Sequence, residues 1–261
     1  MAHADGPVLL RREGAVAQLV LNRPRNHNAL DVEAAQALHA CCSELSGDPG
    51  VRAVIIRGEG ASFGVGGDLA SLRHDAPATA MALIEPLHAS IKMLAALDAP
   101  VIASLRGNVA GGSMSLAMAC DLAIAADDAR FNLAYINVAA SCDLSGSWHL
   151  PRLVGLRNAM AIALLGESLD VREALRLGLV NRVVPAAELD AATDALASRI
   201  AAGPTLAYGR MKRLMRQSFD NDLPAQLDAE RDNFRASAST EDFREALDAF
   251  FGKRAPRFVG R

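Results

Sequence analysis

The sequence lacks a strong charge of either sign. Its 261 residues include 27 Lys and Arg against 30 Asp and Glu, which gives a formal net charge of -3. A protein that binds nucleic acid usually carries a clear excess of basic residues, so nucleic acid is not an expected partner. Local clusters of Arg and Lys still leave room for a phosphorylated ligand.

Cysteine is also scarce, with four residues in the chain. They show no CxxC spacing and no nearby pair of histidines, which argues against a zinc site. Reduced thiols in a cytoplasmic protein are the simpler interpretation, and we expect no bound metal. The cysteines are Cys41, Cys42, Cys120 and Cys142.

The sequence has no apolar run that favours a membrane span. Its most apolar region, residues 101–126, is interrupted by Arg106 and Asp121, so we expect it at the centre of a soluble core. The first residues, MAHADGPVLLRREG, lack a basic stretch followed by a long apolar run, and no secretory signal is predicted. With 51% hydrophobic and 22% charged residues, we expect one large domain, or a domain with a helical appendage.

Strands and helices alternate in the first part of the sequence. β-branched runs at residues 16–22 and 51–58 predict strands. Between them, apolar positions recur at helical spacing after Asp31, a residue suited to an N-cap. The same alternation continues through residues 81–126, and this order is typical of an α/β layered fold.

Strand signals thin out from about Leu156, where segments with helical spacing follow one another towards the C-terminus. Gly203 and Pro204 form the clearest break among them. We therefore divide the chain into two parts. Residues 1–200 are expected to form the α/β core that holds the site, and residues 201–261 a helical region.

Two glycine clusters follow predicted strands: SFGVGGDL at residues 62–69 and GNVAGGS at residues 107–113. A dinucleotide-binding fingerprint that starts at Gly64 would need a glycine where Leu69 stands, and the lysine of a Walker motif is missing. A different use is a pair of backbone N–H groups, one from each loop, that stabilise a carbonyl oxygen as it becomes negative. Glycine permits the close approach this needs, and a helix after Gly112 adds its positive dipole end. On glycine content alone, two ordinary turns remain the alternative.

Five motifs follow one another along the chain, from about Val16 to the C-terminal FFGKR. They read LNRPRNHNAL, SFGVGGDLASL, PVIASLRGNVAGGSMSLAMACDLAIAADDARFNL, WHLPRLVG and EALRLGLVNRVVP. Together they resemble the crotonase family, the enoyl-CoA hydratase/isomerase superfamily. The resemblance implies a crotonase (ClpP-like) α/β spiral of β-β-α units with a C-terminal helical trimerisation region, and hence a homotrimer or a dimer of trimers. It also implies an acyl-CoA thioester as substrate, with coenzyme A as part of that substrate and no metal or redox cofactor.

The resemblance places particular residues at the substrate. The N–H groups of Gly67 and Gly112 correspond to the two oxyanion donors of the family, and Arg25 falls where the family often has a basic residue near the CoA phosphates. Phe250 and Lys253 match a C-terminal pair that reaches the adenine end of CoA, usually from a neighbouring subunit. The residues around Gly67 are expected to lie against the CoA ester, with the carboxylate among them fixing its loop rather than transferring protons; they are Val65, Asp68 and Leu69.

The chain departs from the hydratases of this family at both catalytic glutamates. The corresponding residues are Ser115 and Tyr135, and neither can act as a carboxylate base at neutral pH. Another carboxylate, Asp143, lies in AASCDLSGSWHLPRLVG, where family members that move protons or halides have Asp or Glu. This segment is most similar to the branch of 1,2-epoxyphenylacetyl-CoA isomerases and enoyl-CoA isomerases, although residues 140–142 (ASC) replace the usual Gly-Leu-x-Pro turn.

Asp143 is therefore predicted to be the acid and base of an acyl-CoA isomerase, with an enolate held by the two N–H groups. An apolar wall from Leu144 or Trp148 would raise its pKa. In the alternative, Asp143 only caps the helix LSGSWHLPRL. Other functions left open are a hydratase that positions water with Asp143 and Tyr135, a dehalogenase with Asp143 as nucleophile, and a non-catalytic acyl-CoA-binding protein.

Other polar residues are secondary candidates. His74, after the first glycine loop, is expected at the solvent, and His149 either reaches the site or packs behind it. Tyr135 is expected in the core rather than on the substrate. Ser113 and Ser115 lack a histidine nearby in sequence and the GxSxG elbow of a serine hydrolase.

Overall fold

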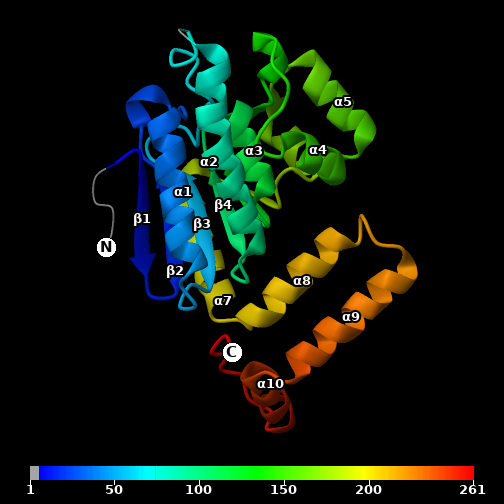
Figure 1. The fold of residues 1–261 in the computed structure, drawn as a ribbon. Coiled ribbons are helices and arrows are strands. Elements are labelled where there is room, and N and C mark those ends of the chain that lie inside the picture. The colour runs from blue at the N-terminus through cyan, green and yellow to red at the C-terminus, as the bar shows by residue number, and fades with distance from the viewer. Residues whose placement is uncertain (1–5, 74) are drawn as a thin grey trace.

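The computed structural model describes residues 6–73 and 75–261 and is built around a six-stranded sheet (Figure 1). Neighbouring strands lie in the order β1-β2-β3-β4-β6-β9, and all pairs are parallel except β1 with β2. Parallel sheets of this kind are usually covered by helices on both faces. The strands are β1 (Val8–Glu13), β2 (Val16–Leu21), β3 (Ala53–Gly58), β4 (Val101–Leu105), β6 (Leu122–Ala126) and β9 (Arg182–Val184).

Helices make up most of the remaining structure (Figure 1). Three short 3-10 turns, η1 (Pro24–Asn26), η2 (Tyr135–Val138) and η3 (Ala186–Glu188), lie between the longer elements. The α-helices are α1 (Val32–Ser46), α2 (Ala76–Ala96), α3 (Gly111–Ala119), α4 (Gly146–Val154), α5 (Leu156–Leu165), α6 (Val171–Leu177), α7 (Leu189–Ala201), α8 (Thr205–Gln217), α9 (Leu223–Ala238) and α10 (Glu241–Phe251).

Alternate residues of the central strands face different helical layers. In β3, Val54 and Ile56 belong to the main hydrophobic core, which also contains the buried faces of α1, α2 and α3. Ala53 and Ile55 of the same strand pack instead with residues of α7. Because successive side chains of a strand point to opposite sides, one short apolar run supplies both faces of the sheet.

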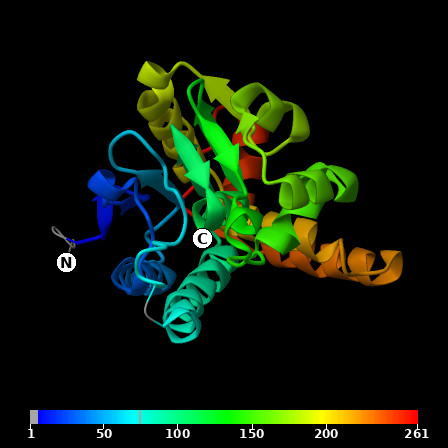
Figure 2. The same ribbon diagram turned by 90° about the horizontal axis from the view of Figure 1, so that it is seen from above.

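A second, small sheet lies beside the main one and has the order β5-β7-β8 (Figure 2). The chain passes from a main strand to a strand of this sheet and then to a helix, first as β4, β5 and α3, then as β6, β7 and α4. This repetition is the predicted spiral of β-β-α units, so the fold class is confirmed. The strands are β5 (Asn108–Ala110), β7 (Arg130–Asn132) and β8 (Leu169–Asp170).

Helices α8, α9 and α10 form an arm beside the α/β core (Figure 1). Two cations fix α8 to the core: Lys212 Nζ and Arg216 Nη2 lie 2.6 and 2.8 Å from the carboxylate of Asp121. That carboxylate also accepts the N–H of Val101 at 2.8 Å, so these partly buried charges are all paired. In the described part of the chain, no helix is both long and apolar enough to cross a membrane.

Some short strands differ from the sequence predictions. No strand was predicted beyond residue 156, yet β8 and β9 lie there, and β9 extends the main sheet next to β6. The strand predicted at residues 51–58 starts two positions later, at Ala53. Strands of two or three residues are too short to display an alternating pattern, which explains why they were missed.

Candidate active site

The two glycine loops lie against each other in the structure. The N–H of Gly64 donates to the carbonyl oxygen of Asn108, the first residue of β5, at 3.0 Å. This bond joins the first glycine loop to the small sheet. Gly66 has a left-handed φ of 88°, and a Cβ built on it would lie 2.9 Å from the backbone nitrogen of Gly112. Only glycine lets the backbone at residue 66 come this close to the backbone of Gly112. The close contact of the two loops brings Gly67 next to the start of α3.

Within residues 6–73 and 75–261, the backbone N–H groups of Gly67 and Gly112 are both without a hydrogen-bond partner. Residues on both sides of Gly67 pair with Leu30, which donates to the Gly66 carbonyl at 2.7 Å and accepts the Asp68 N–H at 2.8 Å, whereas the Gly67 N–H has no partner in the described part of the chain. Gly112 lies in the first turn of α3, where N–H groups have no partner within the helix and the dipole is positive. Two such donors on adjacent loops are suited to hold a negatively charged oxygen.

Asp143 lies beside Gly112. Its Oδ1 is 3.7 Å from the position that a Cβ would take on Gly112, and the hydroxyl oxygen of Tyr135 is equally close. The Tyr135 hydroxyl donates a hydrogen bond to Asp143 Oδ1 and lies 3.1 Å from Ser115 Oγ. The Asp143 carboxylate and the hydroxyl groups of Tyr135 and Ser115 therefore form one cluster, called the Asp143 cluster below. Tyr135 packs against the main hydrophobic core, as expected, and its hydroxyl in addition belongs to this cluster.

Burial sets the protonation of the cluster. It raises the pKa of the Asp143 carboxyl, and the hydrogen bond from Tyr135 offsets part of that rise. Burial and the Asp143 carboxylate raise the pKa of Tyr135, so this hydroxyl stays protonated and acts as a donor. A carboxylate with a raised pKa is a stronger base than an exposed one.

The turn after Asp143 does not have the predicted form of a helix cap. The residue at the N-cap of α4 is Ser145, and no side chain caps this helix, because the Asp143 carboxylate is bound to Tyr135. The interpretation of Asp143 as a cap is therefore wrong. Gly146 follows, and a Cβ there would lie 2.5 Å from Ser115 Oγ. Glycine at this position lets α4 start directly against α3.

The structure brings His88 to the site, a residue that no sequence motif singles out. It lies on α2, and its Nε2 accepts the N–H of Leu144 at 3.1 Å. His149 packs behind the turn, where its Nδ1 lies 3.0 Å from Ser145 Oγ. Burial lowers the pKa of His149 to about 4, so it is neutral at neutral pH. His74 lies outside the described residues.

Trp148 lines a cleft of about 590 Å³ between α4 and α8, and none of the residues of the Asp143 cluster lines it. The guanidinium of Arg152 stacks 4.0 Å above its ring. Of the two apolar residues expected to raise the Asp143 pKa, Leu144 is buried, with 1% of its surface exposed, and Trp148 is 36% exposed. Leu144 thus contributes more to the low-dielectric surroundings.

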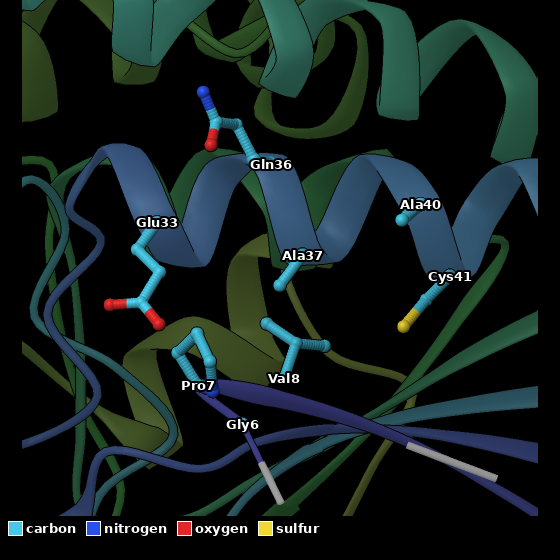
Figure 3. A pocket seen from close by; sticks show the side chains of 8 residues that line it. All are labelled: Gly6, Pro7, Val8, Glu33, Gln36, Ala37, Ala40 and Cys41. Atoms are coloured by element: carbon cyan, nitrogen blue, oxygen red, sulfur yellow. The ribbon is translucent and has the colours of Figure 1, made fainter.

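A further pocket lies between α1 and the start of β1 and has a volume of about 300 Å³. Figure 3 shows the side chains of Glu33, Ala37 and Cys41 on the face of α1 that looks towards Pro7 and Val8. None of these residues belongs to the Asp143 cluster. Among residues 6–73 and 75–261, no group of three His, Cys, Asp or Glu side chains is arranged to hold a metal ion.

The loop before α1 carries the residue expected at the CoA phosphates. Arg25 is exposed in η1 and lines a pocket of about 390 Å³. Its neighbour Arg23 is engaged within the protein, with its guanidinium 2.7 Å from Asp31 and 3.5 Å from Asp68. Asp68 thus ties the first glycine loop to the start of α1. The two remaining residues expected at the CoA ester differ in exposure: Val65 is half-buried and Leu69 is 54% exposed.

Phe250 and Lys253 lie at the far end of the arm. Phe250 is 76% exposed at the end of α10, and Lys253 follows two residues after the helix. In Figure 1, α10 lies well away from α3 and α4. A single chain therefore does not bring this pair to the Asp143 cluster.

Comparisons with known proteins identify the family of the chain. The family described as Enoyl-CoA hydratase/isomerase matches residues 11–261. The chain is 34% identical to the 1,2-epoxyphenylacetyl-CoA isomerase of Escherichia coli (strain K12), with 97% of this chain and 98% of that protein covered. It is 36% identical to the "Probable enoyl-CoA hydratase echA8" of Mycobacterium tuberculosis, with the same coverage. A solved enoyl-CoA hydratase from Polaromonas sp. JS666 superimposes with a TM-score of 0.91 at 34% identity, covering 97% of this chain and 99% of that one.

Proposed function

Because the chain belongs to the enoyl-CoA hydratase/isomerase family, we propose that it is an acyl-CoA isomerase in which Asp143 moves a proton along the acyl chain of a CoA thioester. The observation that carries this proposal is the position of Asp143 Oδ1, 3.7 Å from where a Cβ would lie on Gly112. There the carboxylate is next to one of the two unpaired N–H groups. Its cluster partners Ser115 and Tyr135 are hydroxyl groups, so Asp143 is the base of the cluster.

The proposed reaction starts with the thioester carbonyl oxygen between the N–H groups of Gly67 and Gly112. Asp143 removes a proton from C2 of a 3-enoyl thioester, and the electron pair moves into the carbonyl to form a dienolate. The two N–H groups stabilise the negative oxygen. The protonated Asp143 then gives the same proton to C4 as the carbonyl re-forms, which yields the 2-enoyl thioester. The shift is redox-neutral and consumes no water, so it calls for no further cofactor.

The assay that tests this proposal compares two substrates. A 3-enoyl-CoA is expected to give the conjugated 2-enoyl-CoA, whereas a 2-enoyl-CoA is not expected to gain water. Chromatography of the thioester products distinguishes the two reactions. Hydration of the 2-enoyl-CoA without isomerisation of the 3-enoyl-CoA would favour the hydratase, the second candidate, which a hydratase relative at 36% identity supports. Acyl-CoA binding with no turnover would indicate a non-catalytic protein, and halide release a dehalogenase.

The Tyr135→Phe variant is expected to shift the pH profile. The Tyr135 hydroxyl bonds to the Asp143 carboxylate and lowers its pKa, so removing this hydroxyl raises that pKa. The base is then still protonated at a higher pH than in the wild type. The acidic limb of the plot of kcat/KM against pH therefore shifts to higher pH. Rates of 3-enoyl-CoA isomerisation from acidic to neutral pH measure the shift.

The other tyrosine of the chain provides the control for this variant. Tyr208 lies in α8 and lines the cleft between α4 and α8. Tyr208→Phe removes the same atom at a position outside the Asp143 cluster, and its acidic limb is expected to coincide with that of the wild type. An unmoved limb in Tyr135→Phe would contradict the proposed coupling.

We further propose that residues 201–261 serve assembly and CoA binding, as a unit beside the core of residues 1–200. The arm exposes a series of large apolar side chains, which favours contact with other copies in a homotrimer or a dimer of trimers. In such an assembly Phe250 and Lys253 of one subunit would reach the adenine end of a CoA whose phosphates lie at Arg25 of another. The exposed apolar residues of the arm are Met211, Met215, Phe219, Leu223, Leu227, Phe234, Leu247, Phe250 and Phe251.

A further inference from the structure

The turn between Asp143 and α4 has an unfavourable backbone conformation. Leu144 and Ser145 both have left-handed φ values, 47° and 64°. L-residues other than Gly, Asn and Asp rarely adopt this region, and two in succession are more unusual. Such a conformation persists only where the surrounding contacts determine it. The conformation of these two residues decides where the preceding side chain, that of Asp143, points.

Some of the contacts that hold this turn come from the start of α4 itself. The N–H of Gly146 donates to the carbonyl oxygen of Asp143 at 2.9 Å, and the N–H of His149 to that of Ser145 at 2.9 Å. These bonds fix the turn to its own helix. They do not connect the turn to any other helix.

His88 supplies a connection to another element. Its Nε2 accepts the N–H of Leu144 at 3.1 Å across a separation of 56 residues. Since Nε2 accepts this bond, it carries no proton in this arrangement. The imidazole therefore acts here as an acceptor for the backbone.

Helix α2 gives His88 a firm base. Its apolar face is buried in the main core through Leu83, Leu87, Ile91 and Leu94. The same helix also borders the first glycine loop, since Leu83 Cδ2 lies 3.6 Å from the position of a Cβ on Gly67. One rigid helix thus contacts both the Gly67 loop and the turn after Asp143.

We infer that His88 is a positioning residue: by accepting the Leu144 N–H, it holds the turn that directs the Asp143 carboxylate towards the Gly112 N–H. The inference rests on the proposed role of Asp143 as the base. His88 does not transfer a proton in this arrangement. Its contribution is to keep the distance between base and oxyanion donors constant, a quantity to which reaction rates are very sensitive.

Two replacements of His88 separate this role from others. His88→Leu fills the space without an acceptor, and kcat for 3-enoyl-CoA isomerisation is expected to fall about 10- to 100-fold, with KM changed by less than about threefold. His88→Gln offers an amide oxygen as acceptor and is expected to restore most of kcat. Gln cannot act as an acid or base at neutral pH, so its rescue distinguishes positioning from proton transfer. Lys92→Ala, one turn further along α2 and exposed, is the matched control and is expected to match the wild type.

Hydrogen–deuterium exchange gives a readout that is independent of activity. The amide of Leu144 is expected to exchange faster in His88→Leu than in the wild type, and at close to the wild-type rate in His88→Gln. Equal kcat in His88→Leu and the wild type, or no rescue by Gln, would overturn the inference. If Asp143→Asn also kept full activity, the proposed function itself would fail. A loss of activity in Asp143→Asn with none in His88→Leu would remove only the role of His88.

Discussion

Asp143→Asn is expected to lower kcat for 3-enoyl-CoA isomerisation by about 10²- to 10⁴-fold, the usual contribution of a positioned general base. Asn has the same shape, and its side-chain oxygen can still accept the hydrogen bond that Tyr135 donates to Asp143 Oδ1. It cannot take up the substrate proton. Because the N–H groups of Gly67 and Gly112 are unchanged, binding of a saturated acyl-CoA is expected to be the same as in the wild type. Steady-state kinetics and calorimetric titration with that thioester measure the two quantities.

A remote Asp→Asn replacement controls for the loss of one charge. Asp170 lies at the N-cap of α6, where its Oδ1 accepts the N–H of Glu173, and Asn is an equally good cap. Asp170→Asn is expected to leave both kinetics and stability unchanged. Full turnover in Asp143→Asn, in a protein that unfolds at the wild-type temperature, would exclude Asp143 as the base.

Gly66→Ala is expected to lower kcat by about 10²- to 10³-fold, the effect of losing one oxyanion donor. Gly66 has a φ of 88°, and the new methyl group would lie 2.9 Å from the Gly112 nitrogen and 3.1 Å from the carbonyl oxygen of Ala110. Both neighbours are backbone atoms, so the two glycine loops must separate. The spacing between the Gly67 and Gly112 donors then changes. The variant is measured with the same 3-enoyl-CoA assay, and thermal unfolding reports on its fold.

A second variant tests the same loop contact without a steric clash. Ser113 is fully buried, and its hydroxyl accepts the Gly66 N–H at 3.1 Å. Ser113→Ala removes that acceptor and is expected to reduce kcat in the same direction, by a smaller factor. Gly47→Ala, at the end of α1 with no positive φ and no atom closer than 3.8 Å, is the control. Wild-type kcat in both Gly66→Ala and Ser113→Ala, with both folded, would contradict an oxyanion role for these loops.

The sequence was informative wherever a local pattern determines structure. Asp31 caps α1 through a bond to the Ala34 N–H at 2.9 Å, as its place before a helical repeat predicts. Helix α2 continues through Pro86, as its apolar spacing indicates. The small sheet was not predicted, because its short strands acquire their partners only in the folded chain.

The site shows the same division between local and distant information. The position of Asp143 and the two glycines followed from motifs, whereas the contacts among Asp143, Tyr135 and Ser115 did not, because they join three separate segments. His88 lacked any signal, since its contact is with a backbone N–H 56 residues away. Almost every residue carries a backbone N–H, so a contact with one does not depend on the type of residue at that position and cannot be read from the sequence.

The arrangement around Asp143 also has a stereochemical consequence for the proposed reaction. The hydrogen bond from Tyr135 holds the Asp143 carboxylate in one orientation. One carboxylate that both takes and returns the hydrogen works on a single face of the dienolate, which makes the transfer suprafacial. A deuterium placed at C2 is therefore carried to C4 on that same face wherever Asp143 returns it before its carboxyl exchanges with water. The isomer formed would then retain the isotope of its precursor.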